Sequence, residues 1–231
     1  MPNHVTTICT VTGAADDLQA FATWFAEGFS FERIIPMPEV VRNTESSTDA
    51  TLGYYALHGR FPPSERRSGL TGGRMTLRNF GCVPSEITTQ EQLKAWLHSR
   101  ALEQGAKSYA AECETGFANW YDWASARWGT KWNAYDVETR EVSAERVVFK
   151  FETAWCFPEP IFYRLRQMFP ALVFDVASYD EGGNFGCVGQ WGGLNDFRHV
   201  EVTDELYERV YGHKRERDDD SEDVSEDEDA A

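Results

Sequence analysis

The stretch YDVETREVSAERVVFKFETA, from Tyr135 to Ala154, indicates the fold most directly. It predicts two neighbouring strands, at Tyr135–Val142 and Ala144–Ala154, joined by a short turn as in a hairpin. Side chains of a strand alternate between its two faces, so every second residue shares a face. In the second strand this alternation places the following apolar side chains together: Val147, Phe149 and Phe151.

The residues after this hairpin continue the pattern. Pro158–Phe169 is typical of a helix, with two prolines in its first positions, where proline is tolerated. Leu172–Tyr179 predicts a strand, and the turn sequence DEGG at Asp180–Gly183 precedes a return strand at Asn184–Gly192. The C-terminal half therefore has the order ββαββ.

The N-terminal residues supply one more strand and one more helix. The sequence NHVTTICTVT, Asn3–Thr12, is rich in β-branched residues and predicts a strand buried on both faces. Ala15–Phe29 has apolar residues at helical spacing and acidic residues in its first turn. Phe29–Pro38 holds two prolines and predicts an extended connector. Together these elements indicate an α+β fold.

The middle of the chain differs from both ends. Within it, Asn43–Thr51 is polar and predicts a loop, and a helix is expected from Ser85 to about Gly105. We predict four parts: residues 1–41 as the start of the sheet domain, 42–117 as an insertion of helices and loops, 118–212 as the rest of the sheet domain, and 213–231 as a disordered acidic tail. The insertion also contains a basic cluster: Arg60, Arg66, Arg67 and Arg74.

Composition excludes several classes of protein. The chain has 231 residues and a formal net charge of −16, which disfavours direct binding to a phosphate backbone. It lacks the ~18 consecutive apolar residues of a membrane helix, and its N-terminus does not resemble a signal peptide. We therefore expect a cytoplasmic protein that binds no membrane. The five cysteines are widely spaced, which indicates free buried thiols rather than a metal site.

The segment from Asn119 to Tyr135 contains four of the eight tryptophans. Buried tryptophans pack a core, whereas exposed ones mark binding surfaces. We favour the packing role and keep the binding role as a hypothesis. The candidate binding residues are Trp120, Tyr121, Asp122, Trp123, Arg127, Trp128, Lys131, Trp132 and Asp136.

Four stretches resemble a known family. They are PNHVTTICTVTG (Pro2–Gly13), FSFERIIPMP (Phe29–Pro38), WYDWASARWGTKWNAYD (Trp120–Asp136) and FETAWCFPEP (Phe151–Pro160). They resemble phage and plasmid proteins whose C-terminal part is the YubB-type ferredoxin-like domain. The resemblance implies an antiparallel sheet with helices on one face, carried by a bacterial mobile element. It implies no catalytic residues, and it does not extend to residues 42–117 or to the tail.

Three functions remain open. We favour a non-enzymatic accessory protein that binds a protein partner, in one version as an acidic mimic of nucleic acid that acts on host defence or DNA-processing proteins. The second is an enzyme with a pocket where Asp122, Lys131 and Asp136 converge. The third is a binder of single-stranded nucleic acid that uses the basic cluster. No phosphate-binding, metal-binding or nucleophile motif is present, so we expect no catalytic residues, cofactor or metal. The sequence does not define the oligomeric state.

Overall fold

The computed structural model describes residues 3–63, 75–192 and 196–215. Its main part is an antiparallel sheet in the strand order β2-β3-β1-β4-β5-β6. The strands are β1 (His4–Thr12), β2 (Tyr135–Val142), β3 (Arg146–Ala154), β4 (Val173–Asp180), β5 (Gly186–Trp191) and β6 (Asp196–Val200). The predicted α+β fold, with an N-terminal strand that joins a C-terminal sheet, is confirmed.

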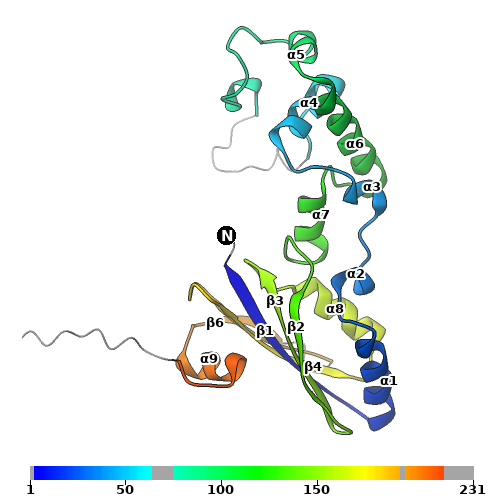
Figure 1. Cartoon of the computed structure of the whole chain (residues 1–231), viewed down its shortest axis with the longest axis vertical. Helices are drawn as coiled ribbons and strands as arrows, with labels where there is room; N and C mark the ends of the chain where they lie inside the picture. The colour runs from blue at the N-terminus through cyan, green and yellow to red at the C-terminus, as the bar shows by residue number, and fades with distance from the viewer. Residues whose placement is uncertain (1–2, 64–74, 193–195, 216–231) are drawn as a thin grey trace, which may run out of the picture.

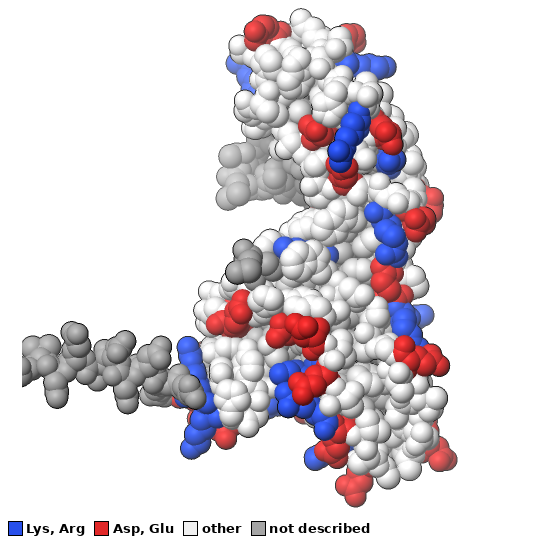
Figure 2. Space-filling view, in the orientation of Figure 1, with Lys and Arg blue, Asp and Glu red and all other residues white. Residues whose placement is uncertain are grey.

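Helices cover the sheet and extend beyond it (Figure 1). They are α1 (Ala15–Ala26), α2 (Phe31–Ile34), α3 (Glu39–Arg42), α4 (Thr48–His58), α5 (Gln90–Trp96), α6 (Ser99–Thr115), α7 (Trp120–Arg127), α8 (Glu159–Met168) and α9 (Asp204–Tyr211), with a 3-10 turn, η2, at Leu77–Asn79. We call α4, α5 and α6 the helical arm. The arm projects from one end of the sheet part, and the outline is hollowed between the two (Figures 1 and 2).

The main core lies between the sheet and the helices α1 and α8. Phe25 of α1 packs on Phe149 of β3, with ring centroids 4.7 Å apart. Phe162 of α8 stacks on Trp191 of β5 at 5.1 Å. These rings are buried, as the alternation in the sequence predicts for Phe149.

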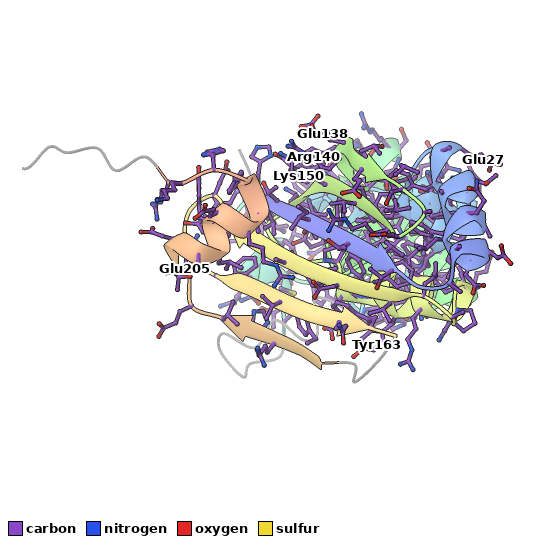
Figure 3. All side chains as sticks on the ribbon, turned by 90° about the horizontal axis from the view of Figure 1, so that it is seen from below. Glu27, Glu138, Arg140, Lys150, Tyr163 and Glu205 are labelled. Atoms are coloured by element: carbon purple, nitrogen blue, oxygen red, sulfur yellow. The ribbon has the colours of Figure 1, made fainter. Side chains whose placement is uncertain are left out.

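Helix α9, which the sequence analysis did not predict, packs on the opposite face. Alternate residues of β4 point to opposite faces, and Val176 belongs to the main core, whereas Tyr179 packs with Leu206 and Val210 of α9. Figure 3 shows α9 lying across the strands. Both faces of the central strands are therefore covered, which accounts for the near-continuous burial of β1.

The helical arm has a small core of its own. Leu52 and Ala56 of α4 pack with Leu93 of α5. Helices α4 and α6 approach closely where Gly53 faces Gly105, because neither residue has a Cβ atom to separate the two backbones. The arm therefore depends on glycine at this crossing.

Two predictions for the middle region are wrong in their boundaries. The helix expected from Ser85 to Gly105 is two helices, α5 and α6. Thr89 caps α5, and the His98 ring caps α6 by accepting a hydrogen bond from the Ala101 amide at 3.1 Å. The loop expected at Asn43–Thr51 ends early, because Ser47 caps α4 through the Ala50 amide.

Other expectations are corrected in part. Phe29–Pro38 contains the one-turn helix α2 as well as extended backbone. The thiols of Cys9 and Cys187 are buried, but Cys82, Cys113 and Cys156 are exposed. Residues 216–231 of the tail expected to be disordered lie outside the described residues. Over the described ranges, no helix is both long and apolar enough to cross a membrane.

Candidate functional site

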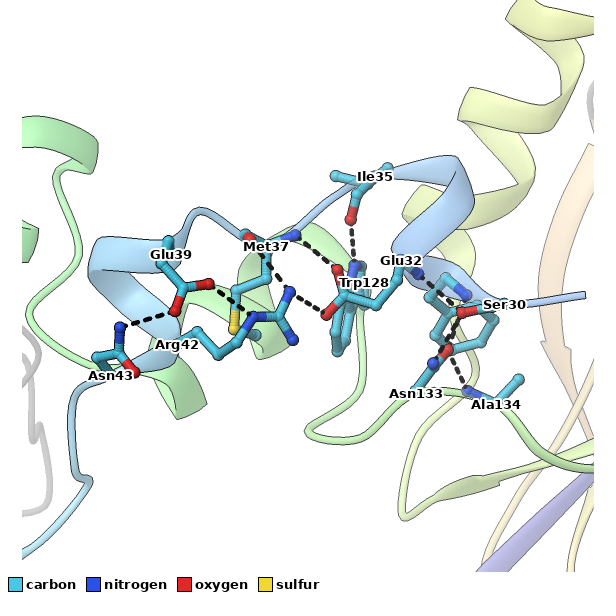
Figure 4. A network of polar contacts seen from close by, with 11 residues as sticks. Ser30, Glu32, Ile35, Met37, Glu39, Arg42, Asn43, Trp128, Asn133 and Ala134 are labelled. Carbon is cyan, nitrogen blue, oxygen red and sulfur yellow. Dashed lines mark hydrogen bonds and ion pairs between the residues drawn. The ribbon is translucent and has the colours of Figure 1, made fainter.

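The tryptophan-rich segment divides into a buried part and an exposed part. Asn119 caps α7 through the Asp122 amide. Trp123 and Trp128, each 4% exposed, meet edge to face in the core. The Trp128 indole also donates a hydrogen bond to the carbonyl of Ile35 at 2.9 Å (Figure 4). These two residues belong to the packing of the fold.

Other candidate residues are held in separate local contacts. Trp120 and Tyr121 are half-buried and contact one another edge to face. The Asp122 carboxylate accepts a hydrogen bond from the Asn119 amide group at 2.7 Å and lines a cavity of about 530 Å³. Arg127 is exposed and lies over the ring of Phe117.

The polar groups required by the enzyme hypothesis are not brought together. Neither Lys131 nor Asp136 lines the cavity beside Asp122. Asp136 is exposed near the start of β2, with a positive φ of 48°. Lys131 instead contacts two tryptophan rings, described below. The cavity beside Asp122 is therefore not shared by the other two residues of this set.

The loop after α7 leaves the core and is fixed at two points. The Thr130 hydroxyl donates a hydrogen bond to the carbonyl of Ala154 at 2.8 Å, at the end of β3. The Asn133 side chain accepts from the Phe31 amide at 2.7 Å and donates to the Ser30 hydroxyl at 2.8 Å (Figure 4). The residues between these points, Lys131 and Trp132, are therefore displayed from a constrained backbone.

Lys131 lies between two exposed indoles. Its Nζ is 4.1 Å from the ring centroid of Trp132 and 3.4 Å from that of Trp155. Trp132 is 41% exposed and Trp155 is 46% exposed. Trp155 also has a positive φ of 67°, an unfavourable conformation for a bulky residue. We call these three residues the Trp clamp. Strained backbone of this kind clusters at functional sites.

A polar cluster lies at the same end of the sheet. Nδ1 of His4 is 2.8 Å from the Tyr135 hydroxyl and 3.1 Å from Oε2 of Glu152. The His4 amide donates to the Glu181 carboxylate at 2.7 Å. We call His4, Tyr135, Glu152 and Glu181 the strand-end cluster. In the sheet register His4 faces Ala154, the residue before Trp155, so the cluster adjoins the Trp clamp.

This end of the sheet faces the helical arm. In Figure 1 the start of β1 and the end of β3 lie on the side of the sheet nearer the helical arm. The Trp clamp and the strand-end cluster together form what we call the strand-end surface. Sequence reasoning singled out Lys131, Trp132 and Asp136 but missed Trp155 and the four residues of the cluster. These residues come together through the pairing of β3 with β2 and of β1 with β3 and β4, which one sequence does not display.

The strand-end cluster gives a pH-dependent prediction. Burial, together with the carboxylates of Glu152, Asp136 and Glu181, raises the pKa of Tyr135 to about 12. An unfolded tyrosine ionises near pH 10, so between about pH 10 and 12 the unfolded chain loses a proton that the native chain keeps. We expect the free energy of unfolding to fall over this window, and to fall less steeply in Tyr135→Phe. Urea denaturation at several alkaline pH values measures both slopes; equal slopes would contradict the shift.

Of the basic cluster, the structure describes only Arg60. The Arg60 guanidinium makes two hydrogen bonds to the Glu112 carboxylate, both at 3.0 Å. This pairing raises the pKa of Arg60, with the hydrogen bond as the main cause. Arg66, Arg67 and Arg74 lie outside the described residues. Arg60 is thus committed to a structural ion pair rather than to a phosphate.

The fold and the strand-end surface define an α+β protein with an antiparallel sheet and an aromatic surface at one end of that sheet. Residues 127–227 match the family model described as a ferredoxin-like domain in Api92-like protein. The match confirms the expected ferredoxin-like fold for this part of the chain. The match includes all three residues of the Trp clamp and three of the four residues of the strand-end cluster, all but His4.

The chain was also compared with solved structures and with curated proteins. A crystal structure of a protein api92 from Yersinia pseudotuberculosis is similar over 88% of this chain and 99% of that one, with 9% identity and a TM-score of 0.44. No curated protein matches the chain.

Proposed function

We propose that this protein is a non-enzymatic accessory protein that binds a protein partner through the strand-end surface. The observation that carries the proposal is the pair of exposed indoles, Trp132 and Trp155, held on constrained backbone at one end of the sheet. Tryptophan is among the residues that most often dominate binding energy at protein interfaces. Exposed large apolar side chains that adjoin one another also mark interaction sites.

We also propose that the protein acts in a bacterial cell that carries a mobile element. The resemblance to YubB-type phage and plasmid proteins supports a role for a bacterial mobile element. We therefore place the protein in the bacterial cytoplasm, with a host protein or a protein of the element as its partner. The cavity beside Asp122 is not shared by Lys131 and Asp136, which favours binding over catalysis.

The mimic of nucleic acid is not the version that we propose. A mimic needs a face on which carboxylates are unopposed. On the face shown in Figure 2, acidic and basic side chains alternate. At the edge of the sheet, Glu138 contacts both Arg140 at 2.8 Å and Lys150 at 3.7 Å (Figure 3). Such pairs lower the local charge that a mimic would present.

The test compares variants in a pull-down from a bacterial host lysate, read by mass spectrometry. The wild type is set beside the double variant Trp132→Ala/Trp155→Gly. The matched control is Trp96→Ala, because Trp96 is similarly exposed, at 45%, but lies on α5 of the helical arm. We expect a protein that the wild type and the control enrich and the double variant loses.

Two results would contradict the proposal. One is a partner retained equally by all three proteins, which would assign binding to another surface. The other is enrichment of no partner by the wild type. A fourth protein, truncated after Gly212, separates any contribution of the acidic tail from that of the strand-end surface.

A further inference from the structure

We propose that the Trp clamp is a cation-binding cage that Lys131 occupies in the free protein, and that a lysine or arginine of a basic partner segment replaces it. This inference rests on the proposed function and adds the chemistry of the partner. The proposed ligand is a protein segment with several positive charges, rather than a phosphate or an acidic peptide.

The geometry of the Trp clamp fits a cation-binding cage. An ammonium group within about 6 Å of an indole centroid is attracted by the ring, and tryptophan gives the strongest attraction of this kind. Lys131 meets this condition for Trp132 and for Trp155 at the same time. Two rings on one cation form a recognition site for ammonium and guanidinium groups.

Lys131 is held weakly in the cage. In the part of the chain that the structure describes, Lys131 makes no ion pair with a carboxylate. Its contacts are the two rings, and exposed cation–π contacts contribute only about 0.5–1 kcal/mol. A lysine on a flexible four-carbon chain can therefore leave the cage at low cost.

The charged side chains near the cage are acidic. Glu152, Glu181 and Asp136 lie close enough to Tyr135 to act on its hydroxyl. Their negative charges favour an incoming cation and oppose an incoming carboxylate. The net charge of the chain, −16, would steer a basic segment toward the protein from a distance.

An acidic peptide segment fits the Trp clamp less well than a basic one. An acidic segment could pair with the Lys131 ammonium, but it would have to approach the three carboxylates of this end of the sheet. A carboxylate also gains nothing from the negative face of an indole, so the two rings would not contribute to its binding. The Trp clamp thus offers a cation contacts with two indole rings, whereas it offers an anion only the Lys131 ammonium.

The experiment uses the full chain and two synthetic peptides of equal length. The first contains lysine and arginine spaced by glycine and serine, and the second has glutamate at each basic position. Affinity is measured by fluorescence anisotropy of the labelled peptides at two salt concentrations. Indole N–H signals in NMR spectra report which tryptophans the peptide contacts.

We expect the basic peptide to bind, more weakly at higher salt, and to shift the indole signals of Trp132 and Trp155. Trp132→Ala and Trp155→Gly should each weaken binding at least about three-fold. Lys131→Ala should tighten binding about two- to five-fold, because the internal occupant is removed. Trp96→Ala, the control, should bind like the wild type. Trp155→Gly is chosen because glycine tolerates the positive φ at this position.

The outcomes separate the two proposals. If the acidic peptide binds and Lys131→Ala abolishes its binding, the inference is overturned while a protein-binding role for the surface stands. If neither peptide shifts the Trp132 and Trp155 signals, but the pull-down partner depends on these residues, the inference again fails alone. If neither peptide nor partner depends on Trp132 and Trp155, both proposals fail.

Discussion

Gly105→Ala should lower the free energy of unfolding by about 2 kcal/mol. A Cβ atom at Gly105 would overlap the backbone of Gly53 and Tyr54 on the facing helix, and would lie 2.6 Å from the Gly53 carbonyl oxygen. The obstacle is backbone, so no side-chain rotation relieves it. Overpacking of this kind costs up to about 3 kcal/mol, and alanine recovers about 1 kcal/mol in a helix interior. The steric cost therefore exceeds the gain in helix propensity from alanine.

The crossing of α4 and α6 must then open, and the loss should fall on the helical arm. Urea denaturation followed by circular dichroism measures the global change, and amide hydrogen exchange locates it. The matched control is Gly81→Ala, because a Cβ atom at Gly81 would meet nothing within 4 Å. We expect the control to change stability by no more than about 0.5 kcal/mol. Equal stability of both variants would mean that the two helices are not in contact at Gly105.

Much of the sheet could be predicted because strand patterns are local. The alternation at Val147, Phe149 and Phe151 depends only on the pleat, and all three side chains are fully buried. The missed elements, β6 and α9, are short and rich in charged residues. The signal of α9 was present: Thr203 caps it by accepting from the Leu206 amide, and Leu206 and Val210 lie four residues apart on one face.

The candidate site could be predicted only in part, because its residues meet through pairings distant in sequence. Lys131 and Trp132 stood out within an aromatic segment. His4 and Tyr135 are 131 residues apart, and His4 and Glu152 are 148 apart, so only the register of the sheet brings them together. Trp132 also lies beyond α7, which ends at Arg127 before Gly129 takes a positive φ of 82°.

The buried and the exposed tryptophans of the tryptophan-rich segment should differ strongly in their effect on stability. Trp128→Ala should lower the free energy of unfolding by about 3–5 kcal/mol, the usual cost of truncating a buried aromatic side chain. The Trp128 ring packs on Trp123 at 5.4 Å and its indole donates to the Ile35 carbonyl. The truncation therefore removes core packing and also the hydrogen bond that ties α7 to the chain after α2.

Trp128→Phe distinguishes these two contributions, because it keeps most of the apolar ring but removes the indole N–H. A buried acceptor left without its donor costs about 1–3 kcal/mol, so this variant should lie between the wild type and Trp128→Ala. Trp132→Ala is the matched comparison from the same segment. Its ring is exposed, and we expect a loss of no more than about 1 kcal/mol, the cation–π contact with Lys131. Urea denaturation of the three variants gives the ranking. If Trp132→Ala proved as destabilising as Trp128→Ala, Trp132 would be a packing residue, and the Trp clamp would lose its role as a binding surface.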